Sequence, residues 1–389
     1  MLDLKTAPPL SLYVHIPWCV KKCPYCDFNS HVHAGGLPQR EYISALLQDL
    51  ETELPDIWGR SILSVFIGGG TPSLFSGESI DNLLSGLRAR LNLAPDIEIT
   101  LEANPGTVEQ QRFSEYRDCG VNRISIGVQS FNPAHLQKLG RIHDEREAAH
   151  AVTAAQKAGF DNINIDLMYG LPQQSLQQAL ADIETAIRLE PTHISHYQLT
   201  IEPNTAFFHR PPALPNDERI WTMQQQCQTL LQHAGYTQYE VSAYARSRRR
   251  CLHNLNYWQF GDYVGIGAGA HQKLTLLNKM VIQRRWKQRL PEQYLSSMMQ
   301  KQHIEGQTEP TRGELEFEFM LNALRLTDGF EPALFYERTG IPLTAIAPTL
   351  ELAEQRELLT WNHKLIKPTE LGRRFLNELL LLFMQEAPK

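Results

Sequence analysis

The stretch SLYVHIPWCVKKCPYC, residues 11–26, joins a short apolar run to three cysteines at the spacing C-x3-C-x2-C. The run SLYVHI (11–16) favours a buried strand, because it is short and rich in residues that pack well on a pleated surface. Three thiols are an odd number for disulfides. They are also one ligand short of a closed tetrahedral zinc site or a fully ligated iron–sulfur cube. The stretch therefore predicts a strand that leads into an incomplete set of metal ligands.

Further β-like runs follow, and amphipathic helical stretches separate them. The β-like runs are LSVFI (63–67), IEITLEA (97–103), RISIGV (123–128), NINIDLM (162–168) and HISHYQL (193–199). The main helical stretches cover residues 41–54, 79–91, 145–159 and 175–189. Alternation of this kind predicts βαβ units around a parallel sheet. With six strands in residues 1–237, we expect an incomplete (β/α)6 barrel, and an open doubly wound sheet is the alternative.

The character of the chain changes after residue 237. Residues 238–300 are rich in aromatic residues and glycine and contain two plausible strands, so we expect a β extension of the sheet. The segment 301–314 has the composition of a polar linker, and helical patterns then continue to the C-terminus. We therefore expect a small helical C-terminal domain over 301–389, with the run LLLLFM (379–384) on the buried face of its last helix.

The bulk composition excludes several classes of protein. The 389 residues are 42% hydrophobic and 21% charged, with a formal net charge of −6, which is typical of a globular protein and gives no basic surface for nucleic acid. The sequence has no signal-peptide pattern and no apolar run long enough to span a bilayer. Three clustered and three scattered cysteines are not a secreted disulfide framework. We therefore expect a cytoplasmic protein.

Polar or glycine-rich segments occur where the predicted strands end. The three cysteines follow the first strand and GGGTP (68–72) follows the second, while Glu102 ends the third. Gln129 and Asp166 lie at the ends of the fourth and fifth strands. In α/β barrels the C-terminal strand ends meet at one rim and build the active site there. We therefore expect one site at this rim.

The cysteine spacing favours an iron–sulfur cluster over zinc. Thiolates are the usual ligands of such clusters, and one short loop at this spacing can reach three irons of a cube. The fourth iron then has no protein ligand and is open to a small molecule. The alternative is a zinc site with three cysteines and either His31 or His33, although the spacing is not that of a zinc finger or ribbon.

Several segments together resemble a known family. CVKKCPYC and GGGTP are similar to the radical S-adenosylmethionine (SAM) superfamily. More specifically, LYVHIPWCVKKCPYCDFNSH, FIGGGTPSL, LEANPGT, NRISIGVQSF, LGRIH and NIDLMYGLP resemble the oxygen-independent coproporphyrinogen III oxidase family, from residue 11 to beyond 270. CDFNSH and HNLNYW (253–258) resemble its heme chaperone branch, the HemW type. The resemblance implies an α/β fold, a partial (β/α)6 radical SAM barrel with a β extension and a small helical C-terminal domain.

The resemblance also implies a set of cofactors and contacts. It implies that Cys19, Cys23 and Cys26 ligate a [4Fe–4S] cluster, whose open iron binds the methionyl amine and carboxylate of SAM. The implied SAM contacts are Tyr13, Gly69, Gly70, Thr71, Glu102, Gln129, Arg141 and Asp166. Glycine lets bare backbone approach the cofactor at little steric cost, whereas the carboxylates accept hydrogen bonds from its ribose or amine.

The motif HNLNYW supplies candidate heme contacts. His253 is the candidate axial ligand, because imidazole is a common ligand of heme iron, and Tyr257 and Trp258 are candidates to stack on the macrocycle. Cys251 and His271 are further candidate ligands. The arginines Arg246, Arg248, Arg249 and Arg250 are candidates to pair with the heme propionates. The alternative is a packing cluster beside a solvated loop.

Two features differ from the dehydrogenase of the same family. The dehydrogenase has a fourth cysteine two positions after the third, where this chain has Phe28, and its first cysteine follows a longer N-terminal arm. The heme chaperone branch shares both departures and is taken to deliver heme to acceptor hemoproteins such as respiratory-chain proteins. The resemblance therefore implies heme and hemoproteins as partners. It is compatible with weak membrane association through clients and with a homodimer.

These observations lead to one expected function and two alternatives. We expect a heme chaperone of the radical SAM type that binds a [4Fe–4S] cluster, SAM and heme. The first alternative is an enzyme, the oxygen-independent coproporphyrinogen III dehydrogenase, which converts two propionates to vinyls with release of CO2. The second is another radical enzyme with an unassigned substrate. Phe28, the short N-terminal arm and HNLNYW favour the chaperone over the dehydrogenase.

Overall fold

A computed structural model describes residues 2–32, 35–106, 111–298, 300 and 302–384 of the chain. Its centre is a run of neighbouring parallel strands, which are β11 (Asp262–Ile266), β1 (Leu10–Ile16), β4 (Ser61–Gly69), β5 (Asn92–Ala103), β6 (Arg123–Gln129), β7 (Ile163–Tyr169) and β8 (His193–Gln198). Each β-like run predicted from the sequence forms one of these strands. Strand β11 does not come from one of these six runs; it lies far along the chain and pairs with β1.

Antiparallel strands extend this run at both edges. The added strands are β9 (Thr237–Glu240) and β10 (Ala243–Ala245) beyond β8, and β12 (His271–Leu276), β13 (Val281–Lys287) and β14 (Ile304–Thr308) beyond β11. The result is one twelve-stranded sheet in the order β14-β13-β12-β11-β1-β4-β5-β6-β7-β8-β10-β9. Within the described residues β14 and β9 do not pair, so the barrel is open. The predicted partial barrel with a β extension is confirmed.

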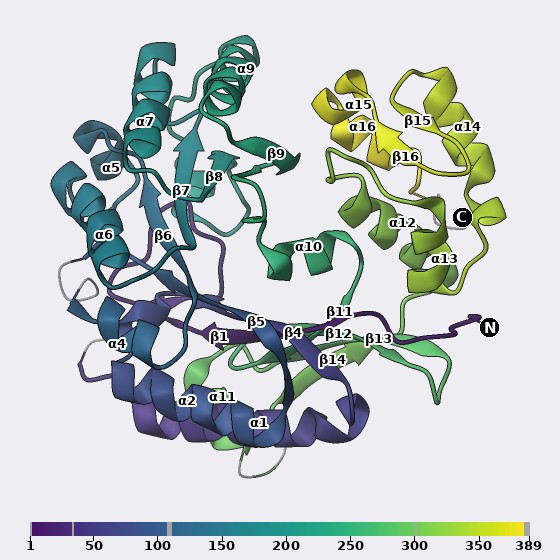
Figure 1. Cartoon of the computed structure of the whole chain (residues 1–389), viewed down its shortest axis with the longest axis horizontal. Coiled ribbons are helices and arrows are strands. Elements are labelled where there is room, and N and C mark those ends of the chain that lie inside the picture. The colour runs from purple at the N-terminus through teal and green to yellow at the C-terminus, as the bar shows by residue number, and fades with distance from the viewer. Residues whose placement is uncertain (1, 33–34, 107–110, 299, 301, 385–389) are drawn as a thin grey trace.

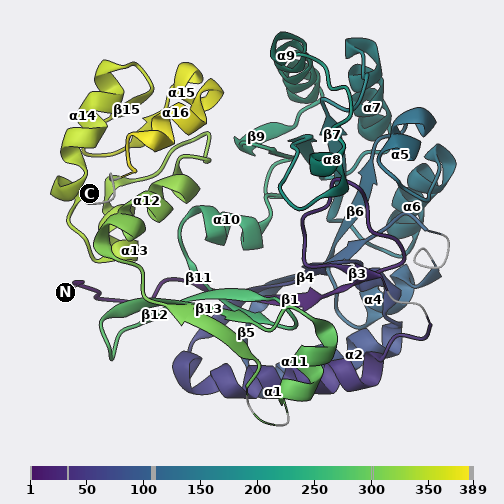
Figure 2. The ribbon, with the colours of Figure 1, turned by 180° about the vertical axis from the view of Figure 1, so that it is seen from behind.

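Helices cover the outer side of the curved sheet (Figures 1 and 2). They are α1 (Gln39–Ile57), α2 (Gly77–Arg90), α4 (Phe113–Asp118), α5 (Pro133–Lys138), α6 (Glu145–Lys157), α7 (Leu176–Arg188), α9 (Asp217–His233) and α11 (Pro291–Met298). Capping boxes begin two of them, with Asp144 and Glu147 at α6 and Ser175 and Gln178 at α7, which satisfies backbone N–H groups that a helix start leaves free. Short elements at the rim are η1 (Pro72–Leu74) and α8 (Ala206–His209).

The two faces of the parallel strands differ in chemistry. Because successive side chains of a strand point to opposite faces, one set faces the helices and the other faces the inside of the curve. The helix-facing set is apolar and buried, and includes Val14, Val65, Leu101, Ile126 and Ile165. The inward set is mostly polar and comprises Ser11, Tyr13, His15, Ser64, Phe66, Glu98, Thr100, Glu102, Arg123, Ser125, Asn164, Asp166, His193 and Ser195. A polar inner face marks this side of the sheet as the place for a ligand.

The motif HNLNYW forms a helix, which differs from the predicted β extension. Residues Leu252–Trp258 are helix α10, and α10 lies against β1 and β4 on the inner side of the sheet, as both views show (Figures 1 and 2). The amide of Asn256 holds it there by donating to Ser11 Oγ at 3.0 Å and to the backbone oxygen of Asp262 at 2.8 Å. The helix therefore fills part of the concave face below the rim.

The C-terminal region is a small helical unit with its own apolar core. It contains α12 (Arg312–Ala323), α13 (Pro332–Thr339), η2 (Leu343–Ala345), α14 (Ala347–Gln355), α15 (Glu370–Arg374) and α16 (Leu376–Leu381), with a hairpin of β15 (Leu359–Trp361) and β16 (Ile366–Pro368). The N-terminal segment contributes Leu4 to this core. In the run LLLLFM, Leu379 and Leu380 are buried whereas Leu381 is 54% exposed, as expected for one face of a last helix.

The prediction of a linker over residues 301–314 is wrong for part of that range. Residues 304–308 form the edge strand β14, which pairs with β13, and residue 301 lies outside the described residues. The predicted boundary at residue 237 falls on the first residue of β9. Among the described helices, none combines the length and the apolar character that crossing a bilayer requires.

Candidate functional site

The three cysteines lie on one loop that two short strands bracket. Strand β2 (Trp18–Cys19) enters the loop and pairs with β3 (His31–Val32) where the loop ends. All three thiols are free and line a cavity of about 400 Å³. Each sulfur has a polar neighbour. Thr71 Oγ1 donates to Cys19 at 3.4 Å, Arg141 Nη1 donates to Cys23 at 3.7 Å, and Ser30 Oγ lies 4.0 Å from the sulfur of Cys26.

The thiols suit a cluster better than a single metal ion. Burial raises the pKa of Cys19 and Cys26, so their thiolates need a cationic group in the cavity. Among the described residues, one group of three or more histidine, cysteine or acidic residues has all its ligand atoms within 4.8 Å of one another, and it does not include the cysteines. The three sulfurs therefore lie farther apart than the ligands of a single tetrahedral ion. His31 is bonded to Asn29 Oδ1 at 3.1 Å, and His33 lies outside the described residues.

Asn29 fixes the end of the cysteine loop to the distant β extension. Its amide donates to the backbone oxygens of Ala268 and Arg289, both at 2.9 Å. Its own backbone oxygen accepts from His15 Nε2 at 2.8 Å. Gly269 leaves room for this amide, because a Cβ there would lie 2.2 Å from Asn29 Nδ2. The cysteine loop is therefore braced by residues more than 200 positions away in sequence.

The glycine turn after β4 permits a close backbone approach. Gly69 has a φ of +115°, and a Cβ on it would lie 2.6 Å from the ring of His15. A Cβ on Gly70 would lie 2.6 Å from the backbone oxygen of Trp18. Side chains at either position would push the turn away from the cysteine loop. The turn instead places the Gly69 N–H 3.1 Å from Glu102 Oε2.

Two carboxylates face the cavity from β5 and β7. Burial, with a contribution from the neighbouring Asp166, raises the pKa of Glu102 to about 8. Burial also raises the pKa of Asp166, although Asn164 and Ser125 donate to its two oxygens at 2.8 and 3.0 Å. A cationic or hydrogen-bond-donating ligand would stabilise both carboxylates in their ionised form.

The remaining predicted rim residues complete the same cavity. Arg141 donates through Nη2 to Asn104 Oδ1 at 2.7 Å and to the backbone oxygen of Gly127 at 2.6 Å, so it ties the third and fourth strand ends to Cys23. Gln129 has a φ of +70°, a conformation that is uncommon for a residue with a side chain and that clusters at functional sites. The structure thus brings Gly69, Gly70, Thr71, Glu102, Gln129, Arg141 and Asp166 together around the cysteines.

Two of the cavities that adjoin the cysteine cavity lie along the inner face of the sheet. One of about 640 Å³ lies toward the β extension, and one of about 290 Å³ lies between the sheet and α10. Glu102 lines all three cavities, and Tyr13 and Tyr257 line the second and third. Tyr13, one of the implied SAM contacts, lines these two cavities rather than the cysteine cavity, and its hydroxyl contacts His15 Nδ1 at 3.0 Å. The cofactor rim and the HNLNYW helix are therefore parts of one continuous hollow.

His253 is held as a neutral imidazole with one free nitrogen. Its Nδ1 lies 3.1 Å from Ser64 Oγ, whose proton goes to Ser11 Oγ at 2.8 Å, so His253 Nδ1 is the donor. That tautomer leaves a lone pair on Nε2, which has no hydrogen-bond partner among the described residues. Burial, followed by the charge of Arg123, lowers the pKa of His253 to about 3, so the ring is uncharged at neutral pH. A neutral imidazole with a free nitrogen is suited to metal ligation.

The other candidate heme contacts differ in their availability. Tyr257 stacks on Tyr263 with 4.2 Å between ring centroids, and the guanidinium of Arg325 lies 4.3 Å from the Trp258 ring centroid. His271 lines the cavity of about 640 Å³, where its ring centroid lies 6.3 Å from that of Trp286.

Cys251 and two of the arginines are committed elsewhere. Burial raises the pKa of Cys251 to about 12, and its sulfur contacts Glu98 Oε1 at 3.6 Å, which disfavours it as a ligand. Arg249 forms an ion pair with Asp161 at 2.9 Å, and Arg250 pairs with Asp328 at 2.8 Å.

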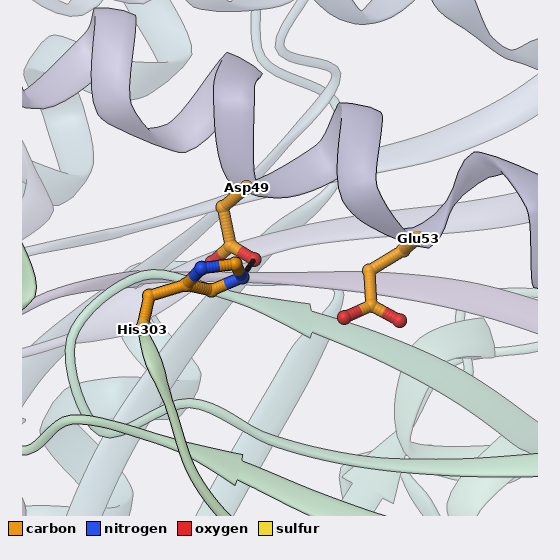
Figure 3. A group of neighbouring side chains, drawn as sticks. All are labelled: Asp49, Glu53 and His303. Atoms are coloured by element: carbon orange, nitrogen blue, oxygen red, sulfur yellow. Dashed lines mark ion pairs between the residues drawn. The ribbon is translucent and has the colours of Figure 1, made fainter. Parts of the chain in front are cut away.

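A second group of possible metal ligands lies outside this hollow. Asp49 and Glu53 on α1 and His303 before β14 converge as Figure 3 shows, and all three are buried. The ammonium of Lys287 already lies 2.7 Å from Asp49 Oδ1 and 2.6 Å from Glu53 Oε1. A buried lysine supplies the positive charge that a metal would otherwise bring. The group therefore braces α1 against the β extension.

Comparisons with known proteins agree with this geometry. The family model described as the radical SAM superfamily matches residues 13–186, and that described as the HemN C-terminal domain matches residues 311–375. The solved structure titled as coproporphyrinogen III oxidase (HemN) from Escherichia coli, a radical SAM enzyme, matches with a TM-score of 0.81. The match covers 97% of this chain and 91% of that one at 24% identity, and it shows a common fold.

Sequence relatives are closer. The protein named heme chaperone HemW of Escherichia coli (strain K12) is 50% identical over 379 residues, which are 97% of this chain and 99% of that protein. The protein of the same name from Haemophilus influenzae (strain ATCC 51907 / DSM 11121 / KW20 / Rd) is 49% identical over 383 residues, with the same coverage of both chains. An identity of one half across nearly the whole of both chains is more than a common fold preserves, and this chain belongs to the HemW family within the radical SAM superfamily.

Proposed function

We propose that this protein is a heme chaperone of the radical SAM type. It holds a [4Fe–4S] cluster through Cys19, Cys23 and Cys26, binds SAM at the rim beside the cluster, and carries heme for transfer to acceptor hemoproteins. The single observation that supports the heme site best is the position of α10. This helix carries HNLNYW across the inner face of the sheet, beside a cavity that Glu102 of the rim also lines.

The rim residues suit the polar parts of SAM. The cluster and SAM would supply any redox chemistry, whereas the protein positions them and controls what reaches them. The backbone of Gly69 and Gly70 lies where a methionyl group can approach, and Thr71 and Arg141 donate to the cysteine sulfurs. Glu102 and Asp166 are buried carboxylates that favour a cationic or donating ligand such as an amine or a ribose hydroxyl. Gln129 and Tyr13 are assigned to the same ligand from the adjoining walls.

We assign His253 as the axial ligand of heme iron through Nε2. Only 3% of this residue is exposed, so heme entry requires the rings around it to shift. Phe66 and Tyr257 are the rings that cover it, with centroids 5.0 and 5.3 Å from the imidazole centroid. Tyr257 and Trp258 lie on the next turn of α10, where they can stack on the macrocycle.

The remaining parts of the proposal concern organisation and partners. We propose three regions, a barrel over 1–237, a β extension over 238–300 and a helical domain over 301–389 that serves client recognition. The sheet favours starting the helical region at α12 (Arg312–Ala323) rather than at residue 301, because β14 belongs to the sheet. Respiratory hemoproteins are the proposed clients, in the cytoplasm and with weak membrane association through them. A homodimer is the proposed assembly.

The first test measures heme binding by the cluster-reconstituted protein. Ferric heme is titrated into wild type and His253→Ala, and the Soret band is followed. We expect the variant to lose the histidine-ligated spectrum and to bind heme at least about tenfold more weakly, since a factor of ten corresponds to about 1.4 kcal/mol. His135→Ala is the matched control, because His135 is also buried but lies on the outer helix α5. An unchanged spectrum in His253→Ala would remove the assignment.

The second test separates the chaperone from the dehydrogenase. The reconstituted protein is incubated without oxygen with SAM, reductant and coproporphyrinogen III, and products are analysed by mass spectrometry. We expect no protoporphyrinogen, because Phe28 stands where the dehydrogenase has a cysteine and is 59% exposed beside the cavity mouth. Protoporphyrinogen that accumulates only in the presence of substrate and SAM would contradict the chaperone proposal in favour of the enzyme.

A further inference from the structure

Arg123 is an unusual residue for the inside of this sheet. It lies on the inner face at the start of β6, is 2% exposed and ranks among the largest fully buried side chains. Arginine is rarely buried unless its charge is paired. Within the described part of the chain, the guanidinium of Arg123 has no ion-pair partner within 4.0 Å, and its Nε is buried without a hydrogen-bond partner.

Two of the carboxylates near Arg123 accept hydrogen bonds from other donors. Asp166 accepts from Ser125 and Asn164, as described above. Glu98 Oε1 accepts from the backbone N–H of His253 at 3.2 Å and from the Cys251 thiol at 3.6 Å. Both carboxylates attract Arg123 at longer range. Long-range attraction does not replace the hydrogen bonds that the guanidinium loses on leaving water.

The guanidinium lies in the cavity beside α10. Arg123 lines this cavity of about 290 Å³ together with His253, Tyr257 and Trp258. It does not line the cavity that holds the cysteines, where Arg141 is the neighbouring cation. A buried cation with free donors that faces a ligand cavity is a preformed site for an anion, and the planar fork of arginine fits a carboxylate best.

We propose that Arg123 binds a carboxylate of the ligand in the α10 cavity, and that this carboxylate is a heme propionate. The inference rests on the proposed function, because it takes heme as the occupant of that cavity. The methionyl carboxylate of SAM is the other source of the same chemistry. The propionate is favoured because Arg123 lines the cavity of HNLNYW and not that of the cysteines. This assignment replaces the candidates Arg249 and Arg250, which are paired with Asp161 and Asp328.

The test compares heme with its dimethyl ester, in which both propionates are uncharged. Each is titrated into the full-length, cluster-reconstituted protein and followed by the Soret band. We expect wild type to bind heme about tenfold to a hundredfold more tightly than the ester, the range for a charge-assisted hydrogen bond. Arg123→Met should bind both ligands alike, with the ester affinity unchanged. Arg249→Met is the matched control and should keep the wild-type preference, because Arg249 pairs with Asp161 away from the cavity.

Each outcome distinguishes this inference from the proposed function. If wild type binds neither ligand, the proposed function fails. If wild type binds heme and ester equally, or Arg123→Met keeps the preference, Arg123 is not the propionate site and the chaperone proposal stands. If Arg123→Met keeps the preference but loses SAM affinity, the bound carboxylate is the methionyl one, which overturns the propionate assignment. The wild-type comparison needs no variant, so it holds even where Arg123→Met does not fold.

Discussion

Lys287 is the residue whose removal tests the brace between α1 and the β extension. Its ammonium lies 2.7 Å from Asp49 and 2.6 Å from Glu53, and all three side chains are 0% exposed. Lys287→Met keeps most of the side-chain volume and removes the charge. Two buried carboxylates then lose their main positive partner. Breaking a buried pair by deleting one member costs about 3–5 kcal/mol of unfolding free energy.

The structure places this variant near the lower end of that range. Glu53 keeps Arg285 at 3.1 Å and the amide of Gln272 at 2.9 Å, while Asp49 keeps the Tyr294 hydroxyl at 2.7 Å. We therefore expect Lys287→Met to lose about 3 kcal/mol at neutral pH.

The loss should depend on pH. In the wild type, burial raises the pKa of Asp49 but the charges of Lys287 and His303 outweigh it, so the pKa lies below its usual value. Without Lys287 the effect of burial dominates and the folded-state pKa lies above the unfolded value. When a carboxyl group has a higher pKa in the folded state, its contribution to the unfolding free energy is fully present below its unfolded pKa of about 3.9. That contribution is lost as the pH rises through the folded-state pKa. The difference between wild type and variant should therefore grow from pH 5 to pH 8.

Urea denaturation at several pH values measures this difference. Lys279→Met is the control, because Lys279 is exposed and its substitution should change the unfolding free energy by less than about 0.5 kcal/mol. A loss in Lys287→Met below about 1 kcal/mol, or one that is larger at pH 5 than at pH 8, would refute the reasoning.

Three further predictions test other parts of the structure. Gly70→Ala should lose cluster iron and SAM binding, because its Cβ would lie 2.6 Å from a backbone oxygen of Trp18; iron content and SAM titration measure this, and a variant with full iron would contradict it. Glu102 has a pKa raised to about 8, so the ligand-free wild type should lose stability as the pH rises from about 4.3 toward 8. Glu102→Gln should remove that decline when the unfolding free energy is measured by urea denaturation. Parallel plots of unfolding free energy against pH for the two proteins would contradict this prediction. Leu379→Ala should cost about 2–5 kcal/mol and the exposed Leu381→Ala less than about 0.5, and equal losses would show that LLLLFM has no buried face.

The parallel strands were predictable because their pattern is local. Each β-like run carries buried side chains on the helix-facing side, and amphipathic stretches mark the helices between them. Strand β14 left no such signal, since IEGQT is mostly exposed and joins the sheet through its backbone at the edge. The helix α10 was missed because seven residues are too few to show a period of 3.6 residues.

The rim was predictable from the rule that parallel strand ends meet. The layer beneath it was not, although a signal was present. Arg123 and Ser125 alternate with buried isoleucines in RISIGV, which places a charged residue on the inner face of a strand. The tautomer of His253 depends on Ser64, which lies 189 positions away in the sequence. The partners of Arg249 and Arg250 lie 88 and 78 positions away, so no local pattern indicates that these arginines pair with acidic residues rather than with a ligand.

The brace at Asn29 has a consequence for biosynthesis. Strand β1 and the cysteine loop emerge first from the ribosome, and β4 follows soon after to pair with β1. The backbone oxygens that accept from Asn29 belong to Ala268 and Arg289, and β11 on the other side of β1 begins only at Asp262. Until about the last third of the chain has been synthesised, the three thiols therefore have an open flank. Cluster delivery can therefore begin before the last strands close this flank.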